Sequence, residues 1–161
     1  MKGYTLIELL VTITIIVLVT GSSMAAYLTY NENRRLDIDG KNLSAFINKV
    51  RAKAVFLEYP KDCSGLINFT VSSELNSKGE RTILKYFANC SSGQSSEIHE
   101  EVLTSSVMDA DLNISFLPIS GNTNSQNDVE ITIRSTKGTA KIKKVVINQF
   151  LGTNNVVNKE E

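Results

Sequence analysis

The chain has 161 residues, 42% of them apolar, and its 17 lysines and arginines balance its 17 aspartates and glutamates. This length and composition allow one domain with a hydrophobic core and one additional segment. The balanced charge excludes recognition of a nucleic acid or an acidic partner through overall charge, so any such partner would need a local patch.

The first predicted element is an apolar helix over residues 4–28, in which Glu8 is the only charged side chain. At about 1.5 Å per residue a helix of this length reaches roughly 37 Å, enough to span the hydrocarbon core of a membrane. In lipid the backbone must satisfy its own hydrogen bonds, which enforces a helix although Ile, Val and Thr are frequent. The hydroxyls of Thr12, Thr14 and Thr20 can bond back to the preceding turn.

Three interpretations of Glu8 compete. A secretory signal peptide would start at Lys2 and be cut near residues 23–25, but a carboxylate at the head of the apolar run opposes it. A plain membrane anchor would carry Glu8 at an uncompensated cost of about 2.5–3.5 kcal/mol. The third interpretation gives Glu8 a function and a partner. Because no lysine or arginine lies between Glu8 and Arg34, that partner comes from outside the helix, and a free α-amino group fits.

Residues 3–10, Gly-Tyr-Thr-Leu-Ile-Glu-Leu-Leu, resemble the type IV prepilin signature, in which a short basic leader ends in glycine. The resemblance implies that a prepilin peptidase cuts between Gly3 and Tyr4 and methylates the new amino group of Tyr4. It also implies that Glu8 pairs with the amino terminus of a neighbouring subunit as subunits leave the bilayer for a helical filament. Charges that are each costly in lipid become tolerable when matched, so pairing favours assembly. Tyr4 replaces the usual phenylalanine, and the membrane segment lacks the proline common in major pilins.

An amphipathic helix is predicted after a polar junction at residues 30–35, and Pro60 ends it. Gly40 is a point at which this helix could bend. We therefore expect one helix over residues 4–58, whose second half lies on a globular domain. Its apolar positions recur at steps of three, four and seven: Leu36, Leu43, Phe46, Ile47, Val50, Ala54 and Leu57.

A β-hairpin is predicted after residue 65, because apolar residues alternate on both sides of a turn near residue 77. Folding at that turn would place Ile67 opposite Tyr86 and Phe69 opposite Leu84.

The same register places Cys63 opposite Cys90. Cross-strand β-carbons lie about 4.5–5.5 Å apart, slightly more than the preferred disulfide spacing, so a modest adjustment closes the bond. We expect a Cys63–Cys90 disulfide, which fits an exported domain in an oxidising compartment. The alternative is a pair of reduced, buried cysteines.

Further strands are predicted over residues 97–104, 112–117, 129–135 and 141–150, with loops at 91–96 and 121–127. A long helix followed by antiparallel strands gives an α+β fold, similar to the pilin-like plan. Residues 114–121 and 129–138 also resemble the GspH/FimT-like branch, which includes pseudopilin H of type II secretion and FimT-like minor pilins. The expected segments are a leader at 1–3, a transmembrane and filament-core half-helix at 4–28, an amphipathic half-helix at 29–58, an antiparallel β domain at 59–151 and a flexible tail at 152–161.

Enzymatic and metal-binding patterns are weak. His99 is the only histidine, the chain has no G-x-S-x-G or glycine-rich phosphate motif, and we expect neither catalysis nor a cofactor. Asp109, Asp111 and Asn113 have the opening spacing of a calcium loop. Ile114 stands where that loop needs glycine, and its bidentate glutamate is missing, so turn acids before a strand are the favoured explanation.

A basic cluster in the last predicted hairpin is a candidate for DNA or phosphate contact, since FimT-like minor pilins are thought to bind DNA through basic carboxyl-terminal residues. No aromatic side chain is interleaved with it, unlike sites where bases stack, so lysines that protect a strand edge are the favoured explanation. The cluster consists of Lys137, Lys141, Lys143 and Lys144.

We therefore expect a non-enzymatic minor pilin or pseudopilin, held first in inner-membrane lipid by a single span with its carboxyl-terminal domain outside the cytoplasm. The resemblance implies as partners a prepilin peptidase and methyltransferase, other pilin or pseudopilin subunits, an assembly ATPase and a platform membrane protein. The alternatives are a signal-anchored extracytoplasmic ligand-binding domain that does not polymerise, and a DNA-binding minor pilin.

Overall fold

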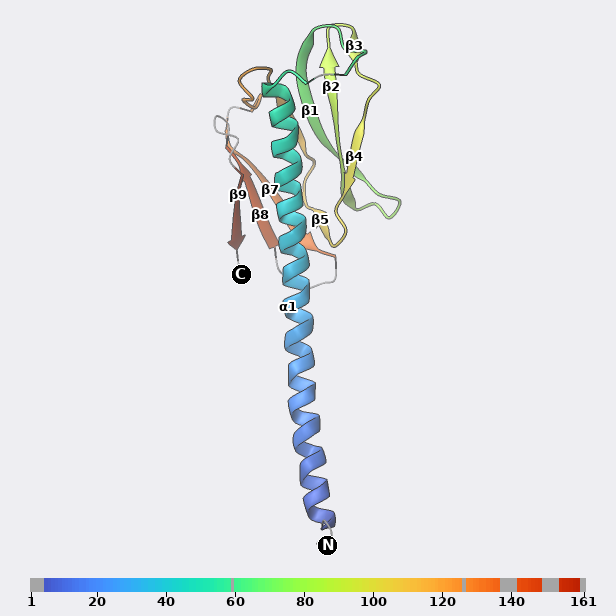
Figure 1. The fold of residues 1–161 in the computed structure, drawn as a ribbon, viewed down its shortest axis with the longest axis vertical. Helices are drawn as coiled ribbons and strands as arrows, with labels where there is room; N and C mark the ends of the chain where they lie inside the picture. Colours follow the sequence, from blue (N-terminus) through green and yellow to red (C-terminus); the bar gives the residue numbers. More distant parts are fainter. Residues whose placement is uncertain (1–4, 59, 126, 137–141, 149–153, 160–161) are drawn as a thin grey trace. The chain divides into compact units, whose positions relative to one another are not determined.

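The computed structural model describes residues 5–58, 60–125, 127–136, 142–148 and 154–159 (Figure 1). Its one long helix, α1, covers Leu6–Val55 and lies at the amino end of the chain, as predicted. The chain divides into two compact units, Met1–Arg34 and Arg35–Glu161. The first unit holds the apolar part of α1, and the second holds the rest of α1 and all the described strands.

The carboxyl end of α1 is closed by a Schellman motif rather than by Pro60 alone. Leu57 has a φ of 56°, its N–H donates to Ala54, and the N–H of Glu58 donates to the carbonyl of Lys53 at 2.9 Å. This motif normally has glycine at the left-handed position. Because leucine occupies it here, the sequence does not reveal where the helix ends, and Leu57 lies beyond the helix, partly exposed, instead of on its apolar face.

The apolar face of α1 packs on two antiparallel sheets. In one sheet the order is β3-β2-β1-β6, and β4 also pairs with β2. In the other the order is β5-β7-β8-β9. The strands are β1 Leu66–Leu75, β2 Arg81–Cys90, β3 Gly93–Gln94, β4 His99–Val102, β5 Ser106–Met108, β6 Asn113–Phe116, β7 Val129–Ser135, β8 Ile142–Ile147 and β9 Asn154–Lys159.

The carboxyl-terminal half of α1 lies along the sheets (Figure 1), and its buried side chains form one hydrophobic cluster with theirs. Phe46 packs edge-on against Tyr86 of β2, with ring centroids 5.6 Å apart. A Cβ at Gly40 would lie 3.5 Å from Ile133 of β7 and 3.2 Å from Lys143 of β8, so glycine allows close approach here, and α1 continues through it without a break. The predicted apolar face is confirmed for Leu36, Leu43, Phe46, Ile47, Val50 and Ala54, which are all buried.

The hairpin β1–β2 forms, but the predicted register is wrong. Phe69 lies opposite Ala88, and Val71 lies opposite Tyr86. The turn closes later than expected because Asn76 shapes it: its side-chain oxygen accepts the N–H groups of Lys78 and Glu80 at 2.8 and 3.0 Å. Gly79 supplies the required positive φ of 78°.

The second sheet is larger than the sequence predicts. Residues 152–161 were expected to form a flexible tail, whereas Asn154–Lys159 form β9 and pair with β8 along its whole length. This pairing uses the main chain, which explains why the polar composition of the segment does not reveal it. The short strands β3 and β5 also lie outside the predicted elements, β3 in a segment expected to be a loop.

Candidate functional site

The amino-terminal unit places Glu8 in the first turn of α1. The hydroxyl of Thr5 accepts the N–H of Glu8 at 3.4 Å, and the Thr5 carbonyl accepts it at 3.1 Å. Thr5 and Glu8 have the three-residue spacing of a capping box, and an acidic residue in the first turn also favours the positive end of the helix dipole. This capping role is not among the predicted features, although the T-x-x-E spacing indicates it.

Within the described residues, Glu8 has no cationic partner, and its side chain is exposed. Gly3 and Tyr4, where cleavage and methylation were predicted, lie outside the described residues. The apolar stretch of α1 is long enough and apolar enough to cross a membrane. A carboxylate in such surroundings is costly unless a counter-charge or hydrogen-bond donors reach it.

Four hydroxyl groups of this apolar stretch are bonded within the helix, as predicted for the three threonines among them. Thr12 donates to the carbonyl of Leu9 at 2.9 Å. Thr14 donates to Leu10 at 2.8 Å. Thr20 and Ser23 donate one turn back at 2.7 and 2.8 Å. These four side chains therefore need no outside partner, whereas the Glu8 carboxylate has none among the described residues.

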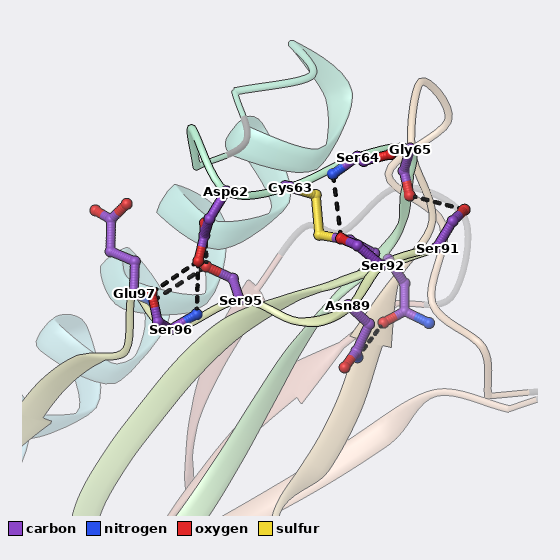
Figure 2. Close-up of a disulfide and its surroundings, with 12 residues drawn as sticks. Asp62, Cys63, Ser64, Gly65, Asn89, Ser91, Ser92, Ser95, Ser96 and Glu97 are labelled. Atoms are coloured by element: carbon purple, nitrogen blue, oxygen red, sulfur yellow. Dashed lines mark hydrogen bonds between the residues drawn. A yellow bond between two sulfur atoms is a disulfide. The ribbon is translucent and has the colours of Figure 1, made fainter.

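The predicted disulfide between Cys63 and Cys90 is present, with the Cα atoms 5.5 Å apart (Figure 2). Its setting differs from the prediction, because Cys63 lies before β1 and Leu66 takes the position opposite Cys90. The pairing of β1 with β2 then shifts in register between Leu66 and Asn68, the next part of β1. The bond therefore ties the segment that links α1 to β1 to the end of β2, instead of joining two paired strand residues.

Asp62, beside the disulfide, holds the same linking segment to the β3–β4 loop (Figure 2). Its carboxylate accepts the hydroxyl of Ser96 at 2.7 Å, the N–H of Ser96 at 2.9 Å and the hydroxyl of Ser95 at 3.0 Å. These bonds, with the Ser96 hydroxyl contributing most, hold the pKa of Asp62 below its ordinary value. No local pattern predicts these hydrogen bonds, because the partners of Asp62 are 33 and 34 residues away.

The described lysines of the predicted phosphate-binding cluster both form ion pairs. Lys143 is buried on β8 and pairs with Asp37 of α1. Lys144 pairs with Glu130 on the neighbouring strand at 2.6 Å. Lys137 and Lys141 lie outside the described residues. The Lys143 ammonium therefore connects helix and sheet and is not presented at the surface.

The acidic residues of the weak calcium pattern are paired with arginines. Asp109 lies 2.8 Å from Arg134, and Asp111 pairs with Arg81. Asn113 is exposed at the start of β6. In the part of the chain that the structure describes, no group of three His, Cys, Asp or Glu side chains is placed to hold a metal ion. The arrangement agrees with charged residues at a turn before a strand.

Comparison with known proteins supports the amino-terminal site. Residues 1–24 match a family model described as the prokaryotic N-terminal methylation motif, which is the prepilin signature. No curated protein and no solved structure matches the chain. The fold and the motif together define a type IV pilin-like layout and indicate a structural protein of the pilin type. The motif implies processing by a prepilin peptidase and assembly with other pilins, and the apolar helix fits a single-pass membrane anchor. The GspH/FimT-like resemblance is not confirmed.

Proposed function

We propose that this chain is a minor pilin or pseudopilin, a structural subunit that is stored in the inner membrane and then added to the filament of a type IV pilus or type II secretion pseudopilus. The observation that carries the proposal is the match of residues 1–24 to the methylation motif, together with an exposed Glu8 at the head of a membrane-length helix, without a cationic partner in the part of the chain that the structure describes. Its carboxyl-terminal domain lies outside the cytoplasm, where a disulfide is stable.

Assembly is favoured because Glu8 and a free, methylated amino group on Tyr4 are each poorly solvated in lipid. When the Glu8 carboxylate meets the amino group of a neighbouring subunit, both charges are matched at once. A partner with this geometry also fixes the axial offset between adjacent subunits. The assembly ATPase and the platform membrane protein that move the subunit belong to the same proposal.

Processing is tested by co-expressing the full chain with a prepilin peptidase and measuring the intact mass of the purified product. We expect loss of Met1, Lys2 and Gly3 and addition of one methyl group at Tyr4. A Gly3→Val variant is the control and should keep its leader. A wild-type chain that still begins with methionine would instead support a signal-anchored domain that does not polymerise.

A further inference from the structure

The carboxyl-terminal unit exposes one continuous face of α1 on which every charge is positive. From residue 35 to residue 56, every third or fourth residue falls on the same side of the helix, and these residues are exposed or half-buried. We call this surface the basic helix face and define it by its charged and large apolar members. They are Arg35, Ile38, Lys41, Lys49 and, in the turn after α1, Phe56.

The charges of the basic helix face are not neutralised within the chain as far as the structure describes it. Two acidic residues lie in this part of α1, but Asp37 pairs with Lys143 and Asp39 is buried. The three cations of the face form no ion pair with a described residue. Phe56 is 74% exposed and Ile38 is 47% exposed. Exposed apolar side chains among unpaired cations are typical of a surface that meets a partner with carboxylates and apolar groups of its own.

A surface with these properties lies on the outer side of the sheet that contains β4 (Figure 1). Side chains alternate between the two sides of a strand, and Tyr86 of β2 faces the helix, where it packs against Phe46. Its neighbour Lys85 therefore points to the outer side, and so does Glu100, which is opposite Lys85 on β4. We call this surface the outer sheet patch. It consists of Glu100 and Val102 of β4, Glu74 of β1 and Ile98 directly before β4.

The outer sheet patch has an excess of negative charge. Lys85 lies 2.7 Å from one carboxylate oxygen of Glu74 and 2.7 Å from one of Glu100, so two carboxylates share a single ammonium. Both carboxylate side chains are about half exposed, whereas Lys85 is largely covered. Arg81, the other basic residue in the described strands of this sheet, pairs with Asp111. Each carboxylate of the patch thus keeps one oxygen available to a further cation.

We propose that the basic helix face of one subunit docks on the outer sheet patch of a second copy of this chain. The inference rests on the proposed function and names the surfaces through which two carboxyl-terminal units meet. Lys41 and Lys49 approach the available oxygens of the carboxylates, while the apolar side chains of the two surfaces cover one another. The opposite charges set the register of the contact, and apolar burial adds to its affinity.

The two surfaces lie on opposite sides of the carboxyl-terminal unit. The basic helix face points away from the sheet, and the outer sheet patch is on the side of the sheet turned away from the helix. A contact between two different surfaces of one chain leaves one of each unused in a pair of subunits, so it can be repeated. Charged side chains on an edge strand oppose pairing with another strand, which favours contact through the face of β4 over extension of the sheet.

This contact involves few residues and is weak in isolation, because exposed ion pairs contribute little and are screened by salt. Subunits held in one membrane have a high effective concentration, which compensates for a weak contact. The contact is therefore tested with the chain in a membrane.

The test uses the full-length chain in phosphatidylcholine vesicles, with unlabelled and isotope-labelled protein in equal amounts. A water-soluble carbodiimide joins lysine amines to carboxylates that touch them, and mass spectrometry identifies the joined peptides. We expect amide links from Lys41 or Lys49 to Glu74 or Glu100. Pairs of one labelled and one unlabelled peptide show that the link joins two chains. The yield of such pairs should fall severalfold at about 1 M salt.

Exchange of the charges across the contact gives the decisive comparison. Lys49→Glu and Glu100→Lys should each lower the yield of links between chains about fivefold, equivalent to one exposed ion pair. A mixture of the two variants should restore the yield, because the charges are then opposite again. Glu101→Lys is the matched control, since Glu101 is opposite Leu84 and points to the other side of β4, and it should link like wild type. Thermal unfolding of each variant checks that the fold is retained.

Links that occur only within one chain, or no links at all, would overturn the proposal. Failure of the variant mixture to restore linking would also overturn it. Leader removal is measured on the same chain co-expressed with a prepilin peptidase. Normal removal without links between chains overturns this contact alone, whereas a retained leader overturns the proposed function.

Discussion

The carboxylate of Asp62 accepts two hydrogen bonds from Ser96, one from its hydroxyl at 2.7 Å and one from its N–H at 2.9 Å. This contact joins the segment after α1 to the loop between β3 and β4. The Cys63–Cys90 disulfide follows one residue later. Two different linkages, one ionisable and one covalent, therefore fix the same short segment on the β domain.

The Asp62 clamp should make stability depend on acidic pH. The folded pKa of Asp62 is lowered by the bonds from Ser96 and Ser95, so its contribution is complete above the unfolded pKa of about 3.9 and is lost as pH falls through the folded pKa. Urea unfolding at a series of pH values should show that Asp62→Asn is destabilised at neutral pH and that its difference from wild type shrinks on acidification. Asp111→Asn, whose side chain is 74% exposed, is the control and should show a smaller effect.

The disulfide should contribute substantially to the stability of the β domain. It closes a loop with a sequence separation of 27, for which the chain-entropy model gives about 3–4 kcal/mol. The double variant Cys63→Ser with Cys90→Ser should lose about that much free energy of unfolding in urea. Wild-type protein under reducing conditions should unfold at the same urea concentration as the double variant. Two free thiols in native, non-reduced protein would contradict this account.

Substitutions of Glu8 can separate its charge from its capping role. Glutamine also suits the third position of a capping box, so Glu8→Gln should keep the start of α1 and its membrane insertion. Because the charge is gone, we expect filament entry to fall at least tenfold, as measured by the amount of subunit in sheared filaments. Glu101→Gln on β4 is the control and should assemble normally. Normal assembly of Glu8→Gln would show that the carboxylate charge is not required.

The ion pair between Asp37 and Lys143 should respond asymmetrically to mutation. The Lys143 side chain is 6% exposed, whereas that of Asp37 is 49% exposed. Asp37→Asn leaves a buried ammonium without its counter-charge and should cost about 3 kcal/mol of unfolding free energy. Lys143→Met removes the charge and keeps most of the stem, so its cost should be smaller.

Chemical denaturation of the two variants measures this difference. A Lys144→Met variant, which removes a more exposed lysine from the same strand, serves as the control. Equal costs for Asp37→Asn and Lys143→Met would show that desolvation of Lys143 is unimportant.

The helix and its buried face could be predicted from the sequence because helical periodicity is a local signal that survives along many residues. The hairpin register could not. The predicted pairing of Phe69 with Leu84 and the observed pairing with Ala88 differ by an even number of residues, so both place the same side chains on the buried face. Only the turn chemistry of Asn76 and Gly79 distinguishes them. The disulfide prediction was thus confirmed although its register was wrong.

The candidate sites show the same division between local and distant signals. Glu8 stands out because its charge interrupts an apolar run, which needs no knowledge of the fold. The role of Asp39 depends on distant partners. Asp39 is buried in α1 and accepts the N–H of Ser105 and the hydroxyl of Ser106, both at 2.8 Å. Spacing along the chain carries no information about such contacts.

The hydroxyls of four residues in the apolar helix already donate to backbone carbonyls of the same helix, so they need no hydrogen-bond acceptor from their surroundings. These residues are Thr12, Thr14, Thr20 and Ser23. Lipid acyl chains offer few hydrogen-bond partners, and so do the packed side chains of neighbouring subunits' helices. Both surroundings therefore suit these four residues. Transfer of the helix from lipid to a packed filament would therefore leave the hydrogen bonds of these four side chains unchanged. If the chain moves from lipid into a filament, the described side chain of this segment whose electrostatic environment has to change is therefore Glu8.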